Sequence, residues 1–343
     1  MRWLWVWASL GLGGVGGLGA GPGEAIAEEP VREETLQSLS RLRQEDVREP
    51  RRVRVRGVVS TVGDGICSPD DWRVRSAYFY MEEGSGALWV PVFRARERGV
   101  WRGEEEFAKV EPGMEVEVEG DVSEGGFAPM LVPRTVRVLG RKALGPPLDP
   151  EWREVFTGGL RARRVRLSGV VQDVRLHRSV SAQVQAKVET GVGHFYVWLP
   201  ERPEYAPGRL LDAEVEVTGA AVVLANWRGE FGHLRLMPMR AEDVVFRKQP
   251  GADPFEVEKV PLERLDSYVP GGRPLHRRRI EGEATYVSAA SLPKPFVVVQ
   301  SGGCAVRVHW AGEFPAGLRV GSRVEASGFI EASREVSDLS GAV

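Results

Sequence analysis

The segment Val53-Arg54-Val55-Arg56-Gly57-Val58-Val59 alternates apolar and charged residues as far as a glycine, and the chain contains this pattern three times. It returns as Val165-Arg166-Leu167-Ser168-Gly169-Val170-Val171 and, more weakly, as Arg278-Arg279-Ile280-Glu281-Gly282-Glu283-Ala284. The three glycines lie 112 and 113 residues apart. A nearly constant period indicates three copies of one structural unit.

A second segment follows the first in each copy. It alternates valine and glutamate in Pro112–Gly120, and related residues occupy Asp212–Gly219 and Gly321–Gly328. Because successive side chains of a strand point to opposite faces, this period of two predicts half-buried strands. Further apolar runs predict hairpins, with turns at residues 83–86, 190–193 and 301–303. Each copy is therefore expected to hold about five short strands, which suits a small closed barrel.

The N-terminal residues have the three parts of a secretory signal. Arg2 precedes an apolar run that begins at Trp3, and the segment ends in the small-x-small site Ala25-Ile26-Ala27. The alternative is a membrane anchor that stays attached, but the run is short and rich in glycine for a span of ~20 residues. We therefore expect residues 1–27 to be a signal peptide and the protein to be exported to the periplasm or cell envelope.

Composition excludes several classes of protein. The chain has 343 residues, with 46 Lys and Arg, 48 Asp and Glu, five His and two Cys. Its formal net charge of −2 lacks the positive excess that is usual in nucleic-acid-binding proteins. Cys67 and Cys304 cannot form a disulfide framework or a four-thiolate zinc site. They lie in different copies, so two free or buried thiols are expected.

No catalytic or metal-binding motif is found. The chain has no Gly-x-Ser-x-Gly elbow, phosphate-cradling loop or His-Glu-x-x-His sequence. Asp64, Asp70 and Asp71 lack the alternating ligand order of a calcium loop. Three histidines fall in the second copy without forming a His-x-His pair: His177, His194 and His233. We therefore expect no enzymatic activity, no cofactor and no metal.

The first copy resembles a known kind of repeat. The residues that carry the resemblance are Arg52–Val59, Phe79–Gly86, Pro112-Gly113 with the Glu/Val strand, Phe127-Ala128-Pro129 and Val136–Gly140. They are similar to the OB-fold-like repeats found outside the membrane in bacterial sensor histidine kinases and related envelope proteins of the verrucomicrobial and acidobacterial type. This chain departs from that family by long insertions at 64–74 and 94–109. Its second copy also matches the aromatic-Glu-Asp-x-Gly-Gly hairpin motif of the family poorly. In that family the barrels precede transmembrane and kinase segments, and neither is present in this sequence.

The repeats and the resemblance together predict an all-β fold of three tandem OB-fold-like five-stranded barrels with short connecting helices. The expected organisation is a signal peptide at 1–27, an N-terminal helical lead-in at 28–50, and barrels at 51–148, 162–248 and 276–343, separated by linkers at 149–161 and 249–275. The second linker is expected to carry a short helix near Pro261–Leu265.

The third barrel is expected to lack its last strand. When Gly328 is aligned with Gly120, Val336–Val343 corresponds to residues from Ala128 onward. Copy one then closes with Val136–Leu139, for which copy three has almost no residues, and a barrel without its last strand exposes an edge. Two alternatives follow: the natural gene product continues beyond Val343, or the third barrel is completed in another way.

Aromatic residues of copy one are the candidate ligand-binding residues: Trp72, Tyr78, Tyr80, Trp89 and Trp101. Alternation places Tyr78 and Tyr80 on one face of a strand and Phe79 on the other, and one face must be core. The alternative role of these rings is therefore packing in the core or at the barrel mouth. If a groove exists, the insertions at 64–74 and 94–109 are its expected rims.

Arginines cluster on or just before the first strand of each copy, which invites an interpretation as a single-stranded nucleic-acid site. The clusters are Arg51, Arg52, Arg54 and Arg56; Arg161, Arg163, Arg164 and Arg166; and Arg277, Arg278 and Arg279. In an OB-type barrel the first strand lies beside the fourth, and the fourth strand here carries Glu115, Glu117 and Glu119. Opposite charges on adjacent strands stabilise each other and cancel the field that a phosphate backbone needs. A nucleic-acid partner is therefore not expected.

The sequence indicates an exported, non-catalytic sensing region that binds a small ligand or an envelope protein. The alternatives are a secreted structural or carbohydrate-binding module and, less favoured, a single-stranded nucleic-acid-binding protein. Contact with a membrane is expected only through a C-terminal part outside this sequence or through an uncleaved signal.

Overall fold

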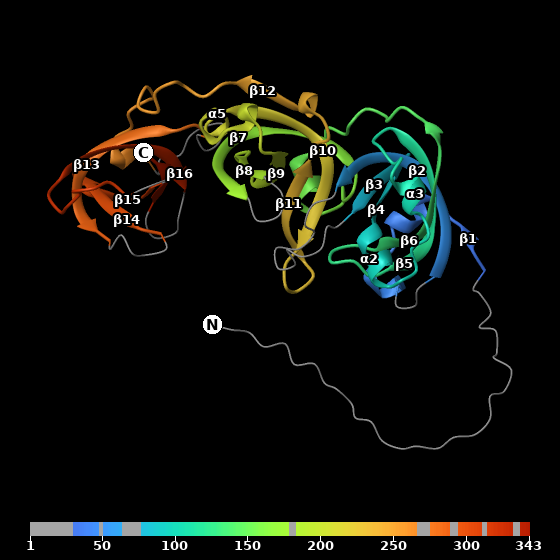
Figure 1. Ribbon diagram of the computed structural model, residues 1–343. Coiled ribbons are helices and arrows are strands. Elements are labelled where there is room, and N and C mark those ends of the chain that lie inside the picture. The colour runs from blue at the N-terminus through green and yellow to red at the C-terminus, as the bar shows by residue number, and fades with distance from the viewer. Residues whose placement is uncertain are drawn as a thin grey trace, which may run out of the picture. The chain divides into compact units, whose positions relative to one another are not determined.

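Most described residues belong to β-strands, which form three sheets in chain order (Figure 1). The computed structural model describes residues 30–47, 51–63, 77–177, 183–265, 275–288, 294–310, 314–331 and 337–343. The predicted signal peptide, 1–27, lies outside these residues and stays a prediction. No helix in the described part of the chain has both the length and the apolar character that crossing a bilayer requires.

The first sheet has the strand order β4-β3-β2-β5-β6, with the short β1 parallel to β2. Its strands are β1 (Arg32–Glu33), β2 (Arg51–Gly63), β3 (Tyr78–Glu83), β4 (Gly86–Pro91), β5 (Met114–Ser123) and β6 (Met130–Arg141). Its helices are α1 (Leu36–Ser40), the 3-10 turn η1 (Gln44–Val47), α2 (Val92–Glu97) and α3 (Glu104–Phe107). The insertion predicted at 94–109 thus contains α3 and most of α2.

The second sheet pairs five strands in a closed circuit, β7-β8-β9-β11-β10, with β12 added beside β10. The strands are β7 (Arg164–His177), β8 (Gln183–Glu189), β9 (His194–Pro200), β10 (Glu214–Ala225), β11 (Phe231–Met237) and β12 (Val244–Lys248). The helical segments are α4 (Trp152–Phe156), η2 (Pro203–Tyr205), α5 (Pro207–Leu210) and η3 (Ala241–Asp243). β9 and β11 are parallel, and the other pairs are antiparallel.

The third sheet is a closed barrel in the order β13-β14-β15-β17-β16. The strands are β13 (Arg278–Val287), β14 (Phe296–Ser301), β15 (Cys304–Trp310), β16 (Arg323–Glu331) and β17 (Asp338–Ala342), and the turn η4 (Leu262–Arg264) precedes them. Cys304 is a free thiol, and Cys67 lies outside the described residues.

The third barrel does not lack its last strand, and of the two alternatives the second holds: the barrel is completed within the described residues. β17 pairs in parallel with β15 and antiparallel with β16, so it closes the barrel. The prediction failed because it started the closing strand of copy one at Val136, whereas β6 already pairs with β5 from Met130. The residues of copy three that correspond to the first half of β6 are enough to close the sheet.

All three sheets repeat one strand order and one register. Numbered within each copy, the order is first, second, third, fifth, fourth; in the first copy the third and fifth strands, β4 and β6, lie near each other without a ladder in their described residues. The repeated glycines face the same position of the repeated valine strand, since Gly57 pairs with Val116, Gly169 with Val215 and Gly282 with Val324. The sequence repeat is therefore also a repeat of backbone pairing.

The three copies also share a shift in strand register shortly after each of these glycines. The ladder between first and second strands shifts between Val59 and Thr61, between Val171 and Asp173, and between Ala284 and Tyr286. A bulge bends its strand and increases its twist. Each first strand can therefore pair with the fourth strand at one end and the second strand at the other.

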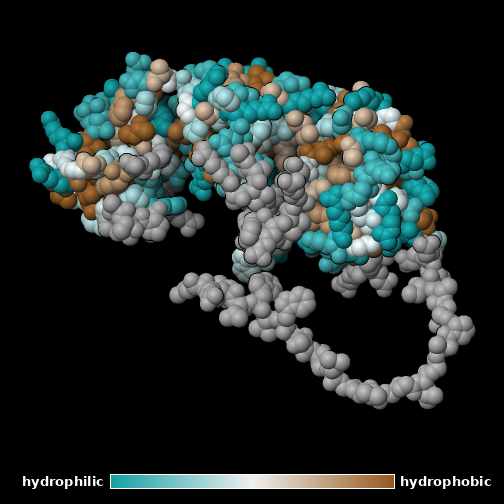
Figure 2. Space-filling view, viewed as in Figure 1, coloured by the Kyte–Doolittle hydropathy of each residue, from teal (hydrophilic) through white to brown (hydrophobic). Residues whose placement is uncertain are grey.

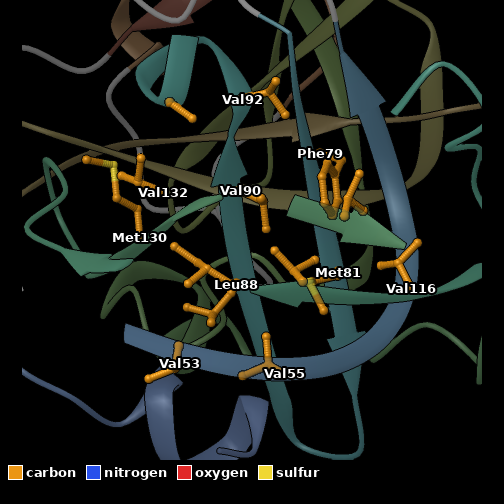
Figure 3. Close-up of a cluster of buried hydrophobic side chains, with 14 of the residues drawn as sticks. Val53, Val55, Phe79, Met81, Leu88, Val90, Val92, Val116, Met130 and Val132 are labelled. Carbon is orange, nitrogen blue, oxygen red and sulfur yellow. The ribbon is translucent and has the colours of Figure 1, made fainter. Parts of the chain in front are cut away.

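Three separate hydrophobic clusters fill the three sheets. In the first, Val53, Val55 and Phe79 are at most 1% exposed and share one cluster with Met81, Leu88 and Val116, which are labelled in Figure 3. The alternation of the sequence produces this directly, because every second residue of β2 from Val53 to Gly57 is buried.

The arginines of β2 are paired with the glutamates of β5, as the sequence predicted. Arg54 lies opposite Glu119 and Arg56 opposite Glu117 in the ladder. Their guanidinium nitrogens lie 2.9 and 2.8 Å from the partner carboxylate oxygens. Side-chain hydrogen bonds to these glutamates raise the pKa of Arg54 and of Arg56. The positive charge of this strand is therefore compensated locally.

Candidate ligand-binding cavity

Three of the five predicted aromatic residues line one cavity of about 380 Å³: Tyr78, Tyr80 and Trp89. Trp101 is not among its lining residues, and Trp72 lies outside the described residues. The cavity is within the usual range of small-molecule sites, roughly 300–1,000 Å³. In the view of Figure 2, the described surface is mainly hydrophilic and its hydrophobic residues form separate patches.

Both faces of strand β3 are buried. One face contributes to the core of the first sheet, and the other lines the cavity. Phe79 is fully buried in the core of the first sheet. Tyr78 and Tyr80, 4% and 6% exposed, point the other way and pack with Ala162 and Ala220 of the second copy. The expectation that one of the two faces is core is confirmed, and the second face is covered as well.

The first copy supplies one wall of the cavity. It consists of side chains of β3 and β4, the start of α2, and the loop between β5 and β6, including Tyr78, Tyr80, Trp89, Phe93, Phe127 and Met130. The Tyr78 and Tyr80 rings meet edge to face with centroids 5.8 Å apart, and the Trp89 and Phe93 rings are 6.1 Å apart. The buried Trp89 Nε1–H has no acceptor among the described residues, which is uncommon for an indole.

The second copy supplies the opposite wall. Its lining residues come from the segment before β7, from β10 and from β11: Arg161, Ala162, Ala221–Ala225, Arg235 and Met237. The Tyr78 hydroxyl donates to the Met237 sulfur at 3.4 Å, which joins the two walls. The cavity therefore exists only because the two copies pack together.

Phe127 fixes the loop between β5 and β6 against the second copy. Its ring meets Phe231 edge to face, with centroids 6.4 Å apart. It also lies so close to Gly158 that a Cβ at that position would be 2.4 Å from the ring. Since Gly158 has a φ of 74°, a side chain there is excluded on two grounds. The loop is thereby held where it can form a rim.

Charged residues also line the cavity. Arg94 and Glu97 of α2 form an ion pair at 3.3 Å, and Glu124 is exposed. The Arg235 guanidinium lies over the Trp198 ring at 4.3 Å. Arg161 donates to the Ser40 carbonyl, and burial lowers the pKa of its guanidinium. Of the two insertions predicted as rims, the one at 94–109 contributes Arg94 and Glu97, and the one at 64–74 lies outside the described residues.

Trp101 belongs to the core of the first sheet. It is 7% exposed and packs edge to face on Phe107, with ring centroids 6.1 Å apart. Its role is the packing that the sequence offered as the alternative to ligand binding. Arg161, Arg235, Phe127 and Met237 were not predicted as site residues. Their sequence context does not identify them as cavity residues, because they reach the cavity through packing between copies.

A second hollow of about 450 Å³ has several basic residues in a lining of mixed polarity: Arg141, Lys142, Arg164 and Arg240. Most of these groups already have partners, such as Glu111 for Arg141 and Glu115 for Lys142, each at 2.8 Å. Within the described residues, no group of three or more His, Cys, Asp and Glu side chains is placed to hold a metal ion.

The chain matches no protein-family model and no curated protein. Among solved structures it is similar to the hypothetical protein YgiW from E. coli (18% identity over 31% of this chain and 88% of that one, TM-score 0.20). It is also similar to a murine DNA-binding protein bound to double-stranded DNA (12% identity over 59% of this chain and 100% of that one, TM-score 0.28). A third similar structure is the tetrameric p202 HIN2 (14% identity over 51% of this chain and 85% of that one, TM-score 0.22). Likenesses with such TM-scores carry no argument about function.

Proposed function

We propose that this chain is an exported, non-catalytic binding region of three tandem OB-like barrels, which senses a small ligand for an envelope protein. The shared strand order and register of the three sheets support the OB-like assignment, because an OB fold is a five-stranded Greek-key barrel. The signal peptide predicted at residues 1–27 supports the proposed location.

The observation that carries the proposal is the aromatic cavity between the first two copies. Tyr78, Tyr80 and Trp89 present ring surface to a space that a small molecule can occupy. Ligand sites are commonly concave, mostly apolar and formed between domains. A ligand that contacts both walls stabilises one arrangement of the two copies over others, and this preference is the signal that a sensing region transmits.

A nucleic acid is not the proposed ligand. The glutamates of β5 neutralise Arg54 and Arg56 on the sheet surface, so the continuous positive field that phosphate backbones require is missing there. The formal net charge of −2 supports the same conclusion.

The proposal is tested by a thermal-shift and calorimetric screen of the purified chain against ring-bearing small molecules and sugars. We expect at least one compound to bind and raise the melting temperature, and Trp89→Ala to weaken its binding by about ten-fold or more, since Trp89 supplies ring contact. Trp227→Ala is the matched control, because Trp227 is 87% exposed and is not among the cavity residues. A screen without any binder, or equal losses in both variants, would contradict the proposal.

A further inference from the structure

Arg161 differs from most arginines of the first two copies in having no acidic partner. Arg52, Arg54 and Arg56 have carboxylate oxygens within 3.0 Å. At the cavity itself, Arg94 has Glu97. In the described part of the chain, no carboxylate lies within 4 Å of the Arg161 guanidinium, although this side chain is half-buried.

The backbone around Arg161 is held firmly in an unusual conformation. The next residue, Ala162, has a φ of 64°, which is costly for a residue with a Cβ. It is fixed by two backbone hydrogen bonds, from Ala162 N to the Ala221 carbonyl at 2.7 Å and from Ala221 N to the Arg163 carbonyl at 2.8 Å. Ala162 itself is buried against Tyr78 and Tyr80. The turn therefore directs Arg161 to the cavity beside the two tyrosines.

The side chain is also restrained at its far end. One Arg161 Nη donates to the main-chain carbonyl of Ser40, at the end of α1. A neutral carbonyl satisfies one donor of the guanidinium but does not neutralise its charge, and an arginine has five N–H donors. A half-buried cation at an apolar wall is destabilising until an anion faces it.

We infer that the ligand of this cavity is a small ring-bearing molecule with an anionic group of the carboxylate type. Its ring packs against Tyr78, Tyr80 and Trp89, and its anionic group faces Arg161. This inference rests on the proposed function and names the chemical class of its ligand. The cavity volume of about 380 Å³ suits a ligand of one or two rings.

The test compares two probes of nearly equal shape, 1-naphthoate and neutral 1-naphthamide, by isothermal titration calorimetry on the full chain. We expect naphthoate to bind about ten-fold or more tightly than naphthamide, because a charge-assisted hydrogen bond contributes about that factor. Arg161→Gln is expected to abolish the difference, and Arg161→Lys to retain part of it. Arg153→Gln, an exposed arginine on α4, is the control that leaves both affinities unchanged.

The outcomes separate the two proposals. If both probes bind equally and Arg161→Gln changes neither affinity, the cavity binds ligands but the anionic class is wrong. If neither probe binds the unaltered chain, the proposed function itself is contradicted for ring-bearing molecules. Thermal unfolding of each variant shows whether it is folded, and Arg161→Lys keeps the test decisive should Arg161→Gln fail to fold.

Discussion

At the scale of single residues, the repeated glycines explain why the three copies share a recognisable sequence segment. A Cβ added at Gly169 would lie 2.4 Å from the Glu189 carbonyl oxygen, and one at Gly282 would lie 2.5 Å from the Gln300 carbonyl oxygen. Both atoms belong to the backbone of the neighbouring second strand. At Gly57 the nearest atoms are instead the ends of two flexible side chains, Leu36 Cδ1 at 2.6 Å and Met81 Cε at 2.9 Å.

These contacts predict different costs for the same substitution. Gly169→Ala must displace a paired strand, so we expect it to lower the free energy of unfolding by roughly 1–3 kcal/mol, the usual range for overpacking. Gly57→Ala is expected to cost less, because the two side chains can move. Urea denaturation of both variants, followed by circular dichroism, measures the difference. A larger loss for Gly57→Ala would show that the backbone contact is not what excludes the side chain.

Cavity residues that are close together in sequence could be predicted, and those that come from another copy could not. Tyr78 and Tyr80 were predictable because alternation within one strand places them together. Arg161 was visible only as a member of an arginine cluster, and that cluster was interpreted as charge balanced by an acidic strand. Its actual environment depends on packing between two copies, which strand periodicity does not encode.

At the scale of elements, period-two patterns and glycine turns predicted the hairpins correctly. The turns at 83–86, 190–193 and 301–303 each lie at the junction of two paired strands. The last strand of copy three was excluded by the alignment with Val136–Leu139, and its own apolar pattern is too weak to correct that alignment: of Asp338–Ala342, only Leu339 and Ala342 are fully buried. A strand of this length is defined by the two neighbours that it joins rather than by its own sequence.

The contact between α2 and α3 predicts a dependence of stability on pH. Arg96 holds the Glu104 carboxylate with two hydrogen bonds, at 2.5 and 2.6 Å, and this pairing lowers the pKa of Glu104 from its ordinary value of 4.5. A carboxylate whose pKa is lowered on folding stabilises the fold above its unfolded pKa, and the effect is lost as the pH falls through the folded value.

We therefore expect Glu104→Gln to lower the free energy of unfolding at pH 7 by about 0.2–1 kcal/mol, the range for exposed ion pairs, and by progressively less below pH 4.5. Urea titrations at pH 7 and pH 3 measure this change. The matched variant is Glu105→Gln, since Glu105 occupies the same helical turn and forms no ion pair within 4 Å in the described residues. A loss at pH 3 as large as that at pH 7 would contradict the assignment.

At the scale of the whole molecule, the three cores are joined unequally. The first and second copies share the buried cluster of Tyr78, Tyr80, Ala162 and Ala220. The second and third copies are joined by polar contacts, including Gln172 Nε2 to the Leu275 carbonyl at 2.7 Å and His276 Nδ1 to Asp212 Oδ1 at 3.0 Å. Apolar burial stabilises more than a few polar contacts, so the first two copies are expected to unfold together.

Differential scanning calorimetry tests this expectation. We expect Ile280→Ala, which removes a fully buried side chain from the third core, to cost about 2–5 kcal/mol and to lower a separate transition. Phe79→Leu in the first core is expected to lower the other transition and to leave that of the third barrel in place. A single transition that shifts as a whole in both variants would show that the three cores unfold as one.

The buried outer face of β3 has a practical consequence for taking this protein apart. A boundary drawn between the first two repeats, which the sequence period invites, would leave Tyr78 and Tyr80 facing water on one fragment and Ala162 and Ala220 on the other. Such fragments would expose apolar surface that promotes aggregation, and they would lose the cavity. The smallest expression unit that preserves this site is therefore a pair of repeats, not one.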